Sequence, residues 1–164
     1  MSGLVENRAA AWALAVDDAV AASAEEAALA TLYFHPGIWI GRLANAVRLT
    51  HSGAVRLVDR LEREGLAQRR SGPDKRMAAI VLTARGNAAA EEFLRRRERA
   101  VAELLAPLTA AERGRLQTLL DKLLGALPTS RPHLETICRF CDYVTCEGTR
   151  RECPVDRALI ARGL

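Results

Sequence analysis

The chain has 164 residues, a formal net charge of +4 at pH 7 and 49% hydrophobic residues. This length allows one domain with an appendage and excludes a multidomain enzyme, and the hydrophobic content excludes wholesale disorder. Alanine is frequent and only 4% of the residues are aromatic, which favours helices. No segment reaches the ~18 consecutive apolar residues of a membrane span, so we expect a cytoplasmic protein without membrane contact.

Three helices are predicted in the first part of the chain. Residues 4–22 carry a loose apolar stripe. Ser23 followed by Glu26 three residues later is typical of a capping box, and it predicts a helix that runs to about Phe34. Residues 38–47 predict a short amphipathic helix after the break at Pro36.

The next predicted helix has one apolar face and one basic face. We expect Ser52 to cap it, and the helix to run from Gly53 to Glu64. Helical spacing places Ala54, Leu57, Val58 and Leu61 on the core side, and Arg56, Arg60 and Arg63 on the other side. Arg60 also has Glu64 one turn away, so a structural ion pair within the helix is the alternative to a contact with a ligand.

A hairpin and two long helices follow. Residues 66–70 and 77–82 predict two strands around a turn. Thr83 is expected to cap a helix over 84–105, and a second capping box begins another helix that ends near Leu127. The leucines of this last helix form an apolar stripe that favours a seam between two subunits.

The excess positive charge is concentrated in the middle of the chain. Between Arg48 and Arg85 there are nine basic and four acidic residues, which gives this segment a net charge of +5. This segment contains, in order, a short helix, a turn, a helix with a basic face and a basic hairpin. The order suits the binding of duplex DNA, because the helix with the basic face fits the major groove and the tip of the hairpin reaches phosphates or the minor groove.

Three motifs in this segment resemble a known family. The motifs are LVDRLEREGL at 57–66, DKR at 74–76 and LTARG at 82–86. They are similar to the winged helix-turn-helix of the MarR family of transcriptional regulators. The resemblance implies a mainly α fold with a small β-hairpin wing. It also implies a homodimer formed through the N- and C-terminal helices, which binds a pseudo-palindromic operator.

The resemblance divides the chain and assigns its site residues. Residues 1–22 and 86–127 would form the dimerisation region, 23–85 the DNA-binding domain and 128–164 a cysteine-rich tail. Ser52 and Arg56 match positions that meet bases or phosphates, Arg76 matches the wing arginine of the minor groove, and Asp74 matches the aspartate that orients it. The complete set of expected DNA-binding residues is Ser52, Gly53, Arg56, Arg60, Asp74, Lys75 and Arg76.

The tail contains the four cysteines, which are Cys138, Cys141, Cys146 and Cys153. Four thiols so close together in a cytosolic protein predict a single metal site. Structural zinc bound by four thiolates is favoured by the opening C-x2-C, a 4Fe-4S cluster is favoured by the closing Cys-Pro, and a thiol switch without metal is the third alternative.

We therefore expect a non-enzymatic, sequence-specific DNA-binding repressor. Its partners would be double-stranded DNA, a second copy of the chain and a small-molecule or redox effector, and its cysteine site would hold a metal or sense redox state. Two alternatives from other classes are a thiol redox or iron–sulfur electron-transfer protein, and a protein-interaction module. The first of these leaves the basic hairpin without a role.

Overall fold

The computed structural model describes residues 21–71, 78–127, 136–140 and 153–163, together with Arg8 and Ala11. Most of the helix predicted over 4–22 lies outside the described residues. The same holds for Asp74, Lys75 and Arg76 of the predicted wing, and for Cys141 and Cys146.

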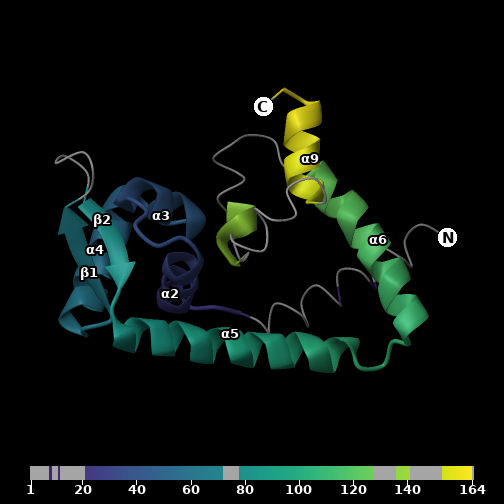
Figure 1. Ribbon diagram of the computed structural model, residues 1–164, viewed down its shortest axis with the longest axis horizontal. Helices are drawn as coiled ribbons and strands as arrows, with labels where there is room; N and C mark the ends of the chain where they lie inside the picture. The colour runs from purple at the N-terminus through teal and green to yellow at the C-terminus, as the bar shows by residue number, and fades with distance from the viewer. Residues whose placement is uncertain are drawn as a thin grey trace.

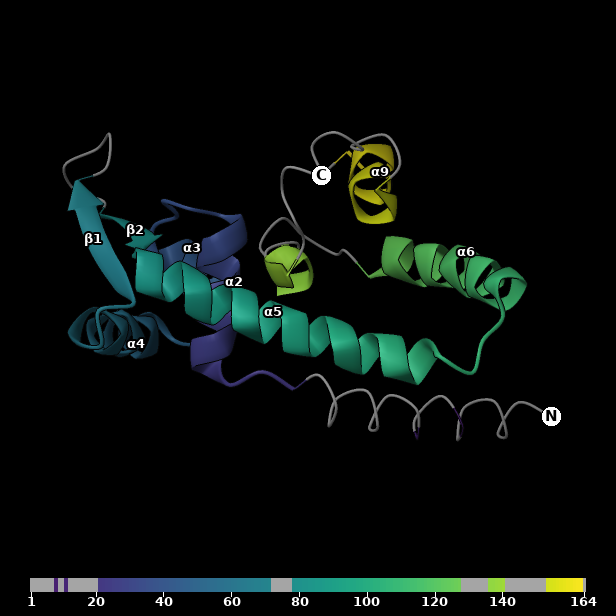
Figure 2. The same ribbon diagram turned by 60° about the horizontal axis from the view of Figure 1, so that its bottom comes forward.

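The described chain is mostly helical, with a unit of three helices and a hairpin at one end of a long helix (Figure 1). The long helix, α5, leads from this unit to α6 and α9 at the other end, an arrangement also visible in the tilted view of Figure 2. The elements are α2 (Ala24–Phe34), α3 (Ile40–Ala46), α4 (His51–Arg63), β1 (Ala67–Ser71), β2 (Ala78–Leu82), α5 (Ala84–Leu105), α6 (Ala110–Ala126), the 3-10 turn η1 (Cys138–Phe140) and α9 (Pro154–Ala161). No helix in the described part of the chain is long and apolar enough to cross a bilayer.

The start of α2 is the capping box that the sequence predicts. The amide of Glu26 donates to the Ser23 hydroxyl over 3.1 Å, and the Ser23 amide donates to the Glu26 carboxylate over 3.0 Å. The same carboxylate forms an ion pair with Arg96 of α5. One acidic residue therefore both starts α2 and joins it to the long helix.

The predicted cap of α4 is wrong. Thr50, not Ser52, is the N-cap, because its hydroxyl accepts a hydrogen bond of 3.1 Å from the Gly53 amide. The helix consequently begins at His51, and Ser52 lies inside its first turn. It ends at Arg63, one residue before the predicted end, where Gly65 adopts a left-handed φ of 67° that suits glycine.

The two strands form an antiparallel hairpin whose register pairs Ala67 with Leu82 and Ser71 with Ala78. A bridge between Trp39 and Ala79 adds a short third segment beside β2. The hairpin is joined closely to the start of α5 at Gly86. A Cβ on Gly86 would lie 1.9 Å from the Leu66 carbonyl oxygen, so only glycine fits this position.

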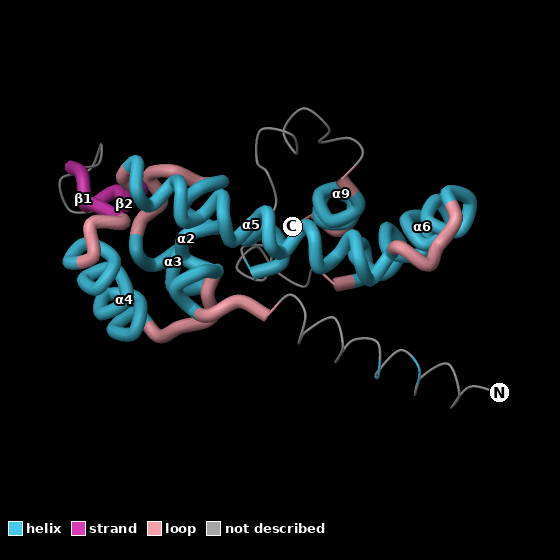
Figure 3. The backbone as a smooth tube through the Cα atoms, turned by 90° about the horizontal axis from the view of Figure 1, so that it is seen from below, coloured by secondary structure: helices cyan, strands magenta, loops and turns pink. Residues whose placement is uncertain are grey.

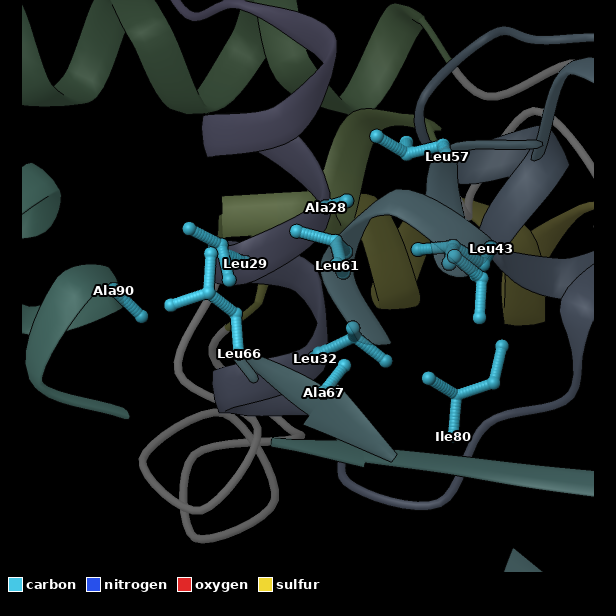
Figure 4. Packing of buried hydrophobic residues seen from close by; sticks show 11 residues of the cluster. Ala28, Leu29, Leu32, Leu43, Leu57, Leu61, Leu66, Ala67, Ile80 and Ala90 are labelled. Atoms are coloured by element: carbon cyan, nitrogen blue, oxygen red, sulfur yellow. The ribbon is translucent and has the colours of Figure 1, made fainter. Parts of the chain in front are cut away.

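The hydrophobic core lies within the helical unit and reaches only the start of α5. Figure 4 shows its side chains converging from α2, α3, α4 and both strands, with Ala90 at the edge. The cluster consists of Ala28, Leu29, Leu32, Leu43, Leu57, Val58, Leu61, Leu66, Ala67, Ile80 and Ala90. The apolar stripe predicted for α4 is confirmed, because all four of its residues are buried. This packing fixes the opposite face of α4 toward solvent.

Candidate nucleic-acid interface

The exposed face of α4 begins with small polar residues and continues with arginines. Ser52 and Arg56 are exposed and lie one turn apart, and Arg63 is exposed two turns after Arg56. The first turn contains no acidic residue, so the positive end of the helix dipole is not offset there. A helix start of this kind attracts phosphate, and the arginines beyond it can reach base edges or the backbone.

Gly53 supports this helix start rather than presenting a side chain. Its amide donates to Thr50, and a Cβ added at Gly53 would lie only 3.1 Å from the Thr50 hydroxyl oxygen. The Ser52 hydroxyl lies 3.3 Å from the same oxygen. Glycine at position 53 thus leaves room for the Thr50 cap.

Two arginines of the basic segment are engaged in ion pairs. Arg60 pairs with Glu25 of α2 over 3.2 Å, and not with Glu64 as the sequence suggested. Arg69 of β1 is held by two carboxylates of α4, Asp59 at 2.7 Å and Glu62. Both arginines join elements of the helical unit, so part of the basic charge counted in the sequence serves the fold.

Arg85 caps the far end of α4, since its guanidinium donates to the Glu64 carbonyl over 3.0 Å. Among the described residues of this segment, Arg48, Arg56, Arg63 and Arg70 are exposed and enter no ion pair, and they are not helix caps. Arg48, Arg63 and Arg70 were absent from the expected site residues. The strand alternation could have indicated Arg70, because it points away from its neighbour Arg69.

The hairpin and α4 lie at the same end of the molecule, as the view from below shows (Figure 3). The structure therefore brings Ser52, Gly53, Arg56 and Arg60 together on one helix beside the hairpin. Asp74, Lys75 and Arg76 fall in the turn between β1 and β2, outside the described residues.

A second exposed surface lies at the other end of the molecule, on α6. None of its residues is buried, and Leu119, Leu123 and Leu127 are 56%, 63% and 48% exposed. Ile160 of α9 is also exposed, by 71%. Contiguous apolar surface of this kind is unusual on a monomer and is typical of an interface.

The described part of the tail contains two of the four cysteines. Cys138 and Cys153 are half-buried and form no disulfide, the first in η1 and the second at the N-cap of α9. His35, the C-cap residue of α2, is hydrogen-bonded to the backbone of Cys138, which tends to raise the pKa of its imidazole. Burial lowers this pKa more strongly, and the Arg42 charge adds to the lowering. Within the described residues, no group of three or more candidate ligands could hold a metal ion.

A sequence model described as the MarR family matches residues 27–77, the stretch from α2 to the hairpin turn. None of the curated proteins matches the chain.

Several solved structures share the fold over most of their own length. The YusO protein of Bacillus subtilis has 23% identity and a TM-score of 0.63, covering 76% of this chain and 95% of that one. The PcaV transcriptional regulator of Streptomyces coelicolor has 27% identity and a TM-score of 0.54, covering 77% and 96%. The MarR family protein Rv2887 of Mycobacterium tuberculosis, solved with salicylic acid, has 26% identity and a TM-score of 0.53, covering 75% and 95%.

Proposed function

We propose that this chain, which carries a MarR-family winged-helix domain at residues 27–77, is a sequence-specific DNA-binding transcriptional regulator. The observation that carries the proposal is the outward face of α4. Its apolar side is fixed in the core, so Ser52, Arg56 and Arg63 are presented together beside the hairpin. Arginines on phosphates would position the protein, and side chains near the helix start would read bases.

The proposed form is a homodimer joined through α6. A second copy would cover the apolar surface that α6 exposes in a single chain, and a twofold axis would present two winged helices to a pseudo-palindromic operator. We place the activity in the cytoplasm and assign the protein no enzymatic reaction.

Selection of DNA by the purified protein tests this function. The full-length chain is incubated with a pool of random duplexes, and bound duplexes are enriched over several rounds. We expect enrichment of a motif with two inverted half-sites about one helical turn apart. Arg56→Ala should weaken the enrichment, whereas Arg99→Ala, which removes the same charge from the exposed part of α5, should preserve it. A pool that stays random would refute sequence-specific binding.

Regulation is proposed as repression relieved by an effector. The similarity to Rv2887, which was solved with salicylic acid, supports a small-molecule effector of this chain. Such an effector would act by stabilising a separation of the two α4 helices that no longer fits the half-sites.

The tail is proposed to bind a metal through Cys138, Cys141, Cys146 and Cys153. Both cysteines that lie in the described segments are half-buried, and a half-buried thiolate is partly shielded from solvent, which suits a metal ligand. Four thiolates would hold structural zinc, with a 4Fe-4S cluster as the alternative and a metal-free thiol switch as the third reading. The bound metal would stabilise a tail with few apolar side chains.

Metal analysis of anaerobically purified protein separates these readings. Zinc at one equivalent per chain in a colourless protein supports the structural zinc site. Iron with sulfide in a brown protein supports the 4Fe-4S cluster. Cys153→Ser should lower the metal content in either case. Protein without metal, in which the thiols oxidise reversibly in pairs, supports the switch and refutes a metal site.

A further inference from the structure

The turn between α3 and α4 contains an arginine in a backbone conformation that usually belongs to glycine. Arg48 has a left-handed φ of 56°, and within the described residues it is the only residue other than glycine with a positive φ. In this conformation the Cβ atom lies too close to the following carbonyl oxygen, which destabilises the folded chain. Arginine at this position therefore makes the fold less stable than glycine would.

The hydrogen bonds at the end of α3 explain why the backbone is left-handed here. The Arg48 amide donates to the Asn45 carbonyl over 3.2 Å, and the Leu49 amide donates to the Ala44 carbonyl over 2.9 Å. These are the two hydrogen bonds of a Schellman motif, which satisfies the last carbonyl groups of a helix and needs a left-handed residue. The end of α3 thus imposes the conformation, whichever side chain the residue carries.

The same motif ends α4 with a glycine. The Gly65 amide donates to the Glu62 carbonyl over 3.0 Å, and the Leu66 amide donates to the Leu61 carbonyl over 2.8 Å. Gly65 has a φ of 67°, as has Gly163 after α9. Glycine is the usual residue at this position, because it has no Cβ. The chain therefore uses glycine after α4 and α9, whereas it places an arginine after α3.

The side chain of Arg48 lies beside the start of α4. It is exposed and forms no ion pair with another described residue. The next residue, Leu49, packs against the core, and its Cβ lies 3.6 Å from the position of a Cβ at Gly53. Thr50 then caps α4. Because Leu49 holds the turn against the first turn of α4, the exposed guanidinium of Arg48 belongs to the same end of that helix as Ser52.

This place is suited to a phosphate contact. In a helix-turn-helix, the first helix crosses the DNA backbone while the second enters the major groove. The turn that joins α3 to α4 would therefore lie at the edge of the groove, which phosphates line. A guanidinium can bind a phosphate through two parallel hydrogen bonds, and a glycine in its place could not.

We infer that Arg48 is a phosphate-binding residue that positions α4 on duplex DNA, and that this contact is the reason for arginine where the backbone favours glycine. The inference rests on the proposed function, because α3 and α4 must dock on a duplex. It adds to the interface a residue that lies outside α4 and the hairpin. A phosphate carries no sequence information, so Arg48 would strengthen binding to every duplex and leave the selected motif unchanged.

Two substitutions separate the side chain of Arg48 from its backbone. Arg48→Ala removes the guanidinium but keeps the Cβ, whereas Arg48→Gly removes both. Both variants should bind a selected duplex about tenfold more weakly, and the affinity for a duplex of unrelated sequence should fall by the same factor. The slope of the logarithm of affinity against the logarithm of salt concentration should become shallower by about two, one phosphate contact from each subunit.

The stability of the two variants should differ although their DNA binding agrees. Arg48→Gly relieves the left-handed strain, so its midpoint of thermal unfolding should lie roughly 2–4 °C above that of Arg48→Ala. Gly65→Ala is the matched control, because it adds a Cβ to the same motif after α4 without a change of charge. It should lower the midpoint of thermal unfolding and leave the salt slope as it is in the parent protein.

The outcomes separate this inference from the proposed function. If both Arg48 variants kept the affinity and the salt slope of a parent protein that selects a motif, the inference would be overturned and the proposed function would stand. A loss of affinity confined to the selected duplex would assign Arg48 to base reading and overturn the phosphate contact. Equal midpoints of Arg48→Gly and Arg48→Ala would contradict the strain. A parent protein that selects no motif contradicts the proposed function itself.

Discussion

At the scale of single residues, the basic segment consists of two kinds of arginine. Arg60 and Arg69 form ion pairs between elements, and Arg85 caps a helix. Arg56 and Arg63 are exposed on the face of α4 that the core leaves outside. A count of charge along the sequence weights all five equally, whereas only the exposed and unengaged ones can bind DNA without breaking a contact of the fold.

This distinction predicts opposite effects for two arginines on one helix. Arg63→Ala should weaken binding to a selected duplex by about tenfold, roughly the loss of one good phosphate or base contact. The midpoint of thermal unfolding of this variant should stay unchanged. Arg60→Ala should change affinity less and lower stability slightly, because it releases Glu25. Fluorescence anisotropy and thermal unfolding measure the two effects, and equal losses of affinity would refute the distinction.

Gly86 gives a second prediction at this scale. A Cβ at this position would lie 1.9 Å from the Leu66 carbonyl oxygen, which is itself held by a 3.0 Å hydrogen bond from the Thr83 amide. Gly86→Ala should therefore destabilise the protein by about 1–3 kcal/mol, as overpacking commonly does.

Gly114→Ala is the matched control for Gly86→Ala, because both positions are helical and Gly114 has open space around it. We expect it to stabilise α6 by up to about 1 kcal/mol through higher helix propensity. Urea unfolding measures both variants. If Gly86→Ala left the free energy of unfolding unchanged, this would contradict the close packing between the hairpin and α5.

At the scale of elements, local signals predicted most of the helices and both strands. Capping boxes at Ser23 and Thr109 located the starts of α2 and α6, because the reciprocal hydrogen bonds involve residues only three apart. The start of α4 was misplaced by two residues because Thr50 and Ser52 both have hydroxyls that can cap. Only the folded geometry shows which one faces the amide of Gly53.

Contacts between distant elements could not be predicted in the same way. Glu25 pairs with Arg60, and the tail packs on α2, through positions far apart in the chain. Nothing in local spacing indicates such pairs, because they depend on how the elements pack. The exposed face of α4 was predictable from periodicity, whereas the arginines left free on it were not.

The junction of α2 with α5 predicts a pH dependence of stability. Burial tends to raise the pKa of Glu26, but hydrogen bonds from Ser23 and the contact with Arg96 outweigh it and hold the pKa below its ordinary value. The ionised form is thus preferred in the folded protein. Its contribution to stability is present above the ordinary carboxyl pKa and is lost as the pH falls through the lower, folded value.

Unfolding of Glu26→Gln between pH 3 and pH 7 measures this contribution. The variant should have a lower free energy of unfolding than the parent protein at neutral pH. This difference in free energy should shrink as the pH falls below the ordinary carboxyl pKa. Glu98→Gln is the control, since Glu98 is exposed on α5 and forms no ion pair among the described residues. A difference that stays constant over this pH range would contradict the assigned role of Glu26.

At the scale of the whole molecule, α5 separates two exposed surfaces. The winged helix at one end presents the basic face of α4, and the other end exposes the apolar surface of α6. A net charge of +4 on the chain is too small to indicate a nucleic-acid partner by itself. Because the excess charge is concentrated at one end, that end would attract a phosphate backbone. Dimerisation at the other end would double the number of contacts on one duplex.

The most direct test of DNA binding by the dimer is a titration of a selected duplex at several salt concentrations. The account predicts two chains per duplex and an affinity that falls steeply and linearly on a logarithmic salt scale, because phosphate contacts release counterions. Arg56→Ala should weaken binding and make this slope shallower by about two, because one phosphate contact is lost from each subunit. One chain per duplex, or an affinity independent of salt, would contradict the account.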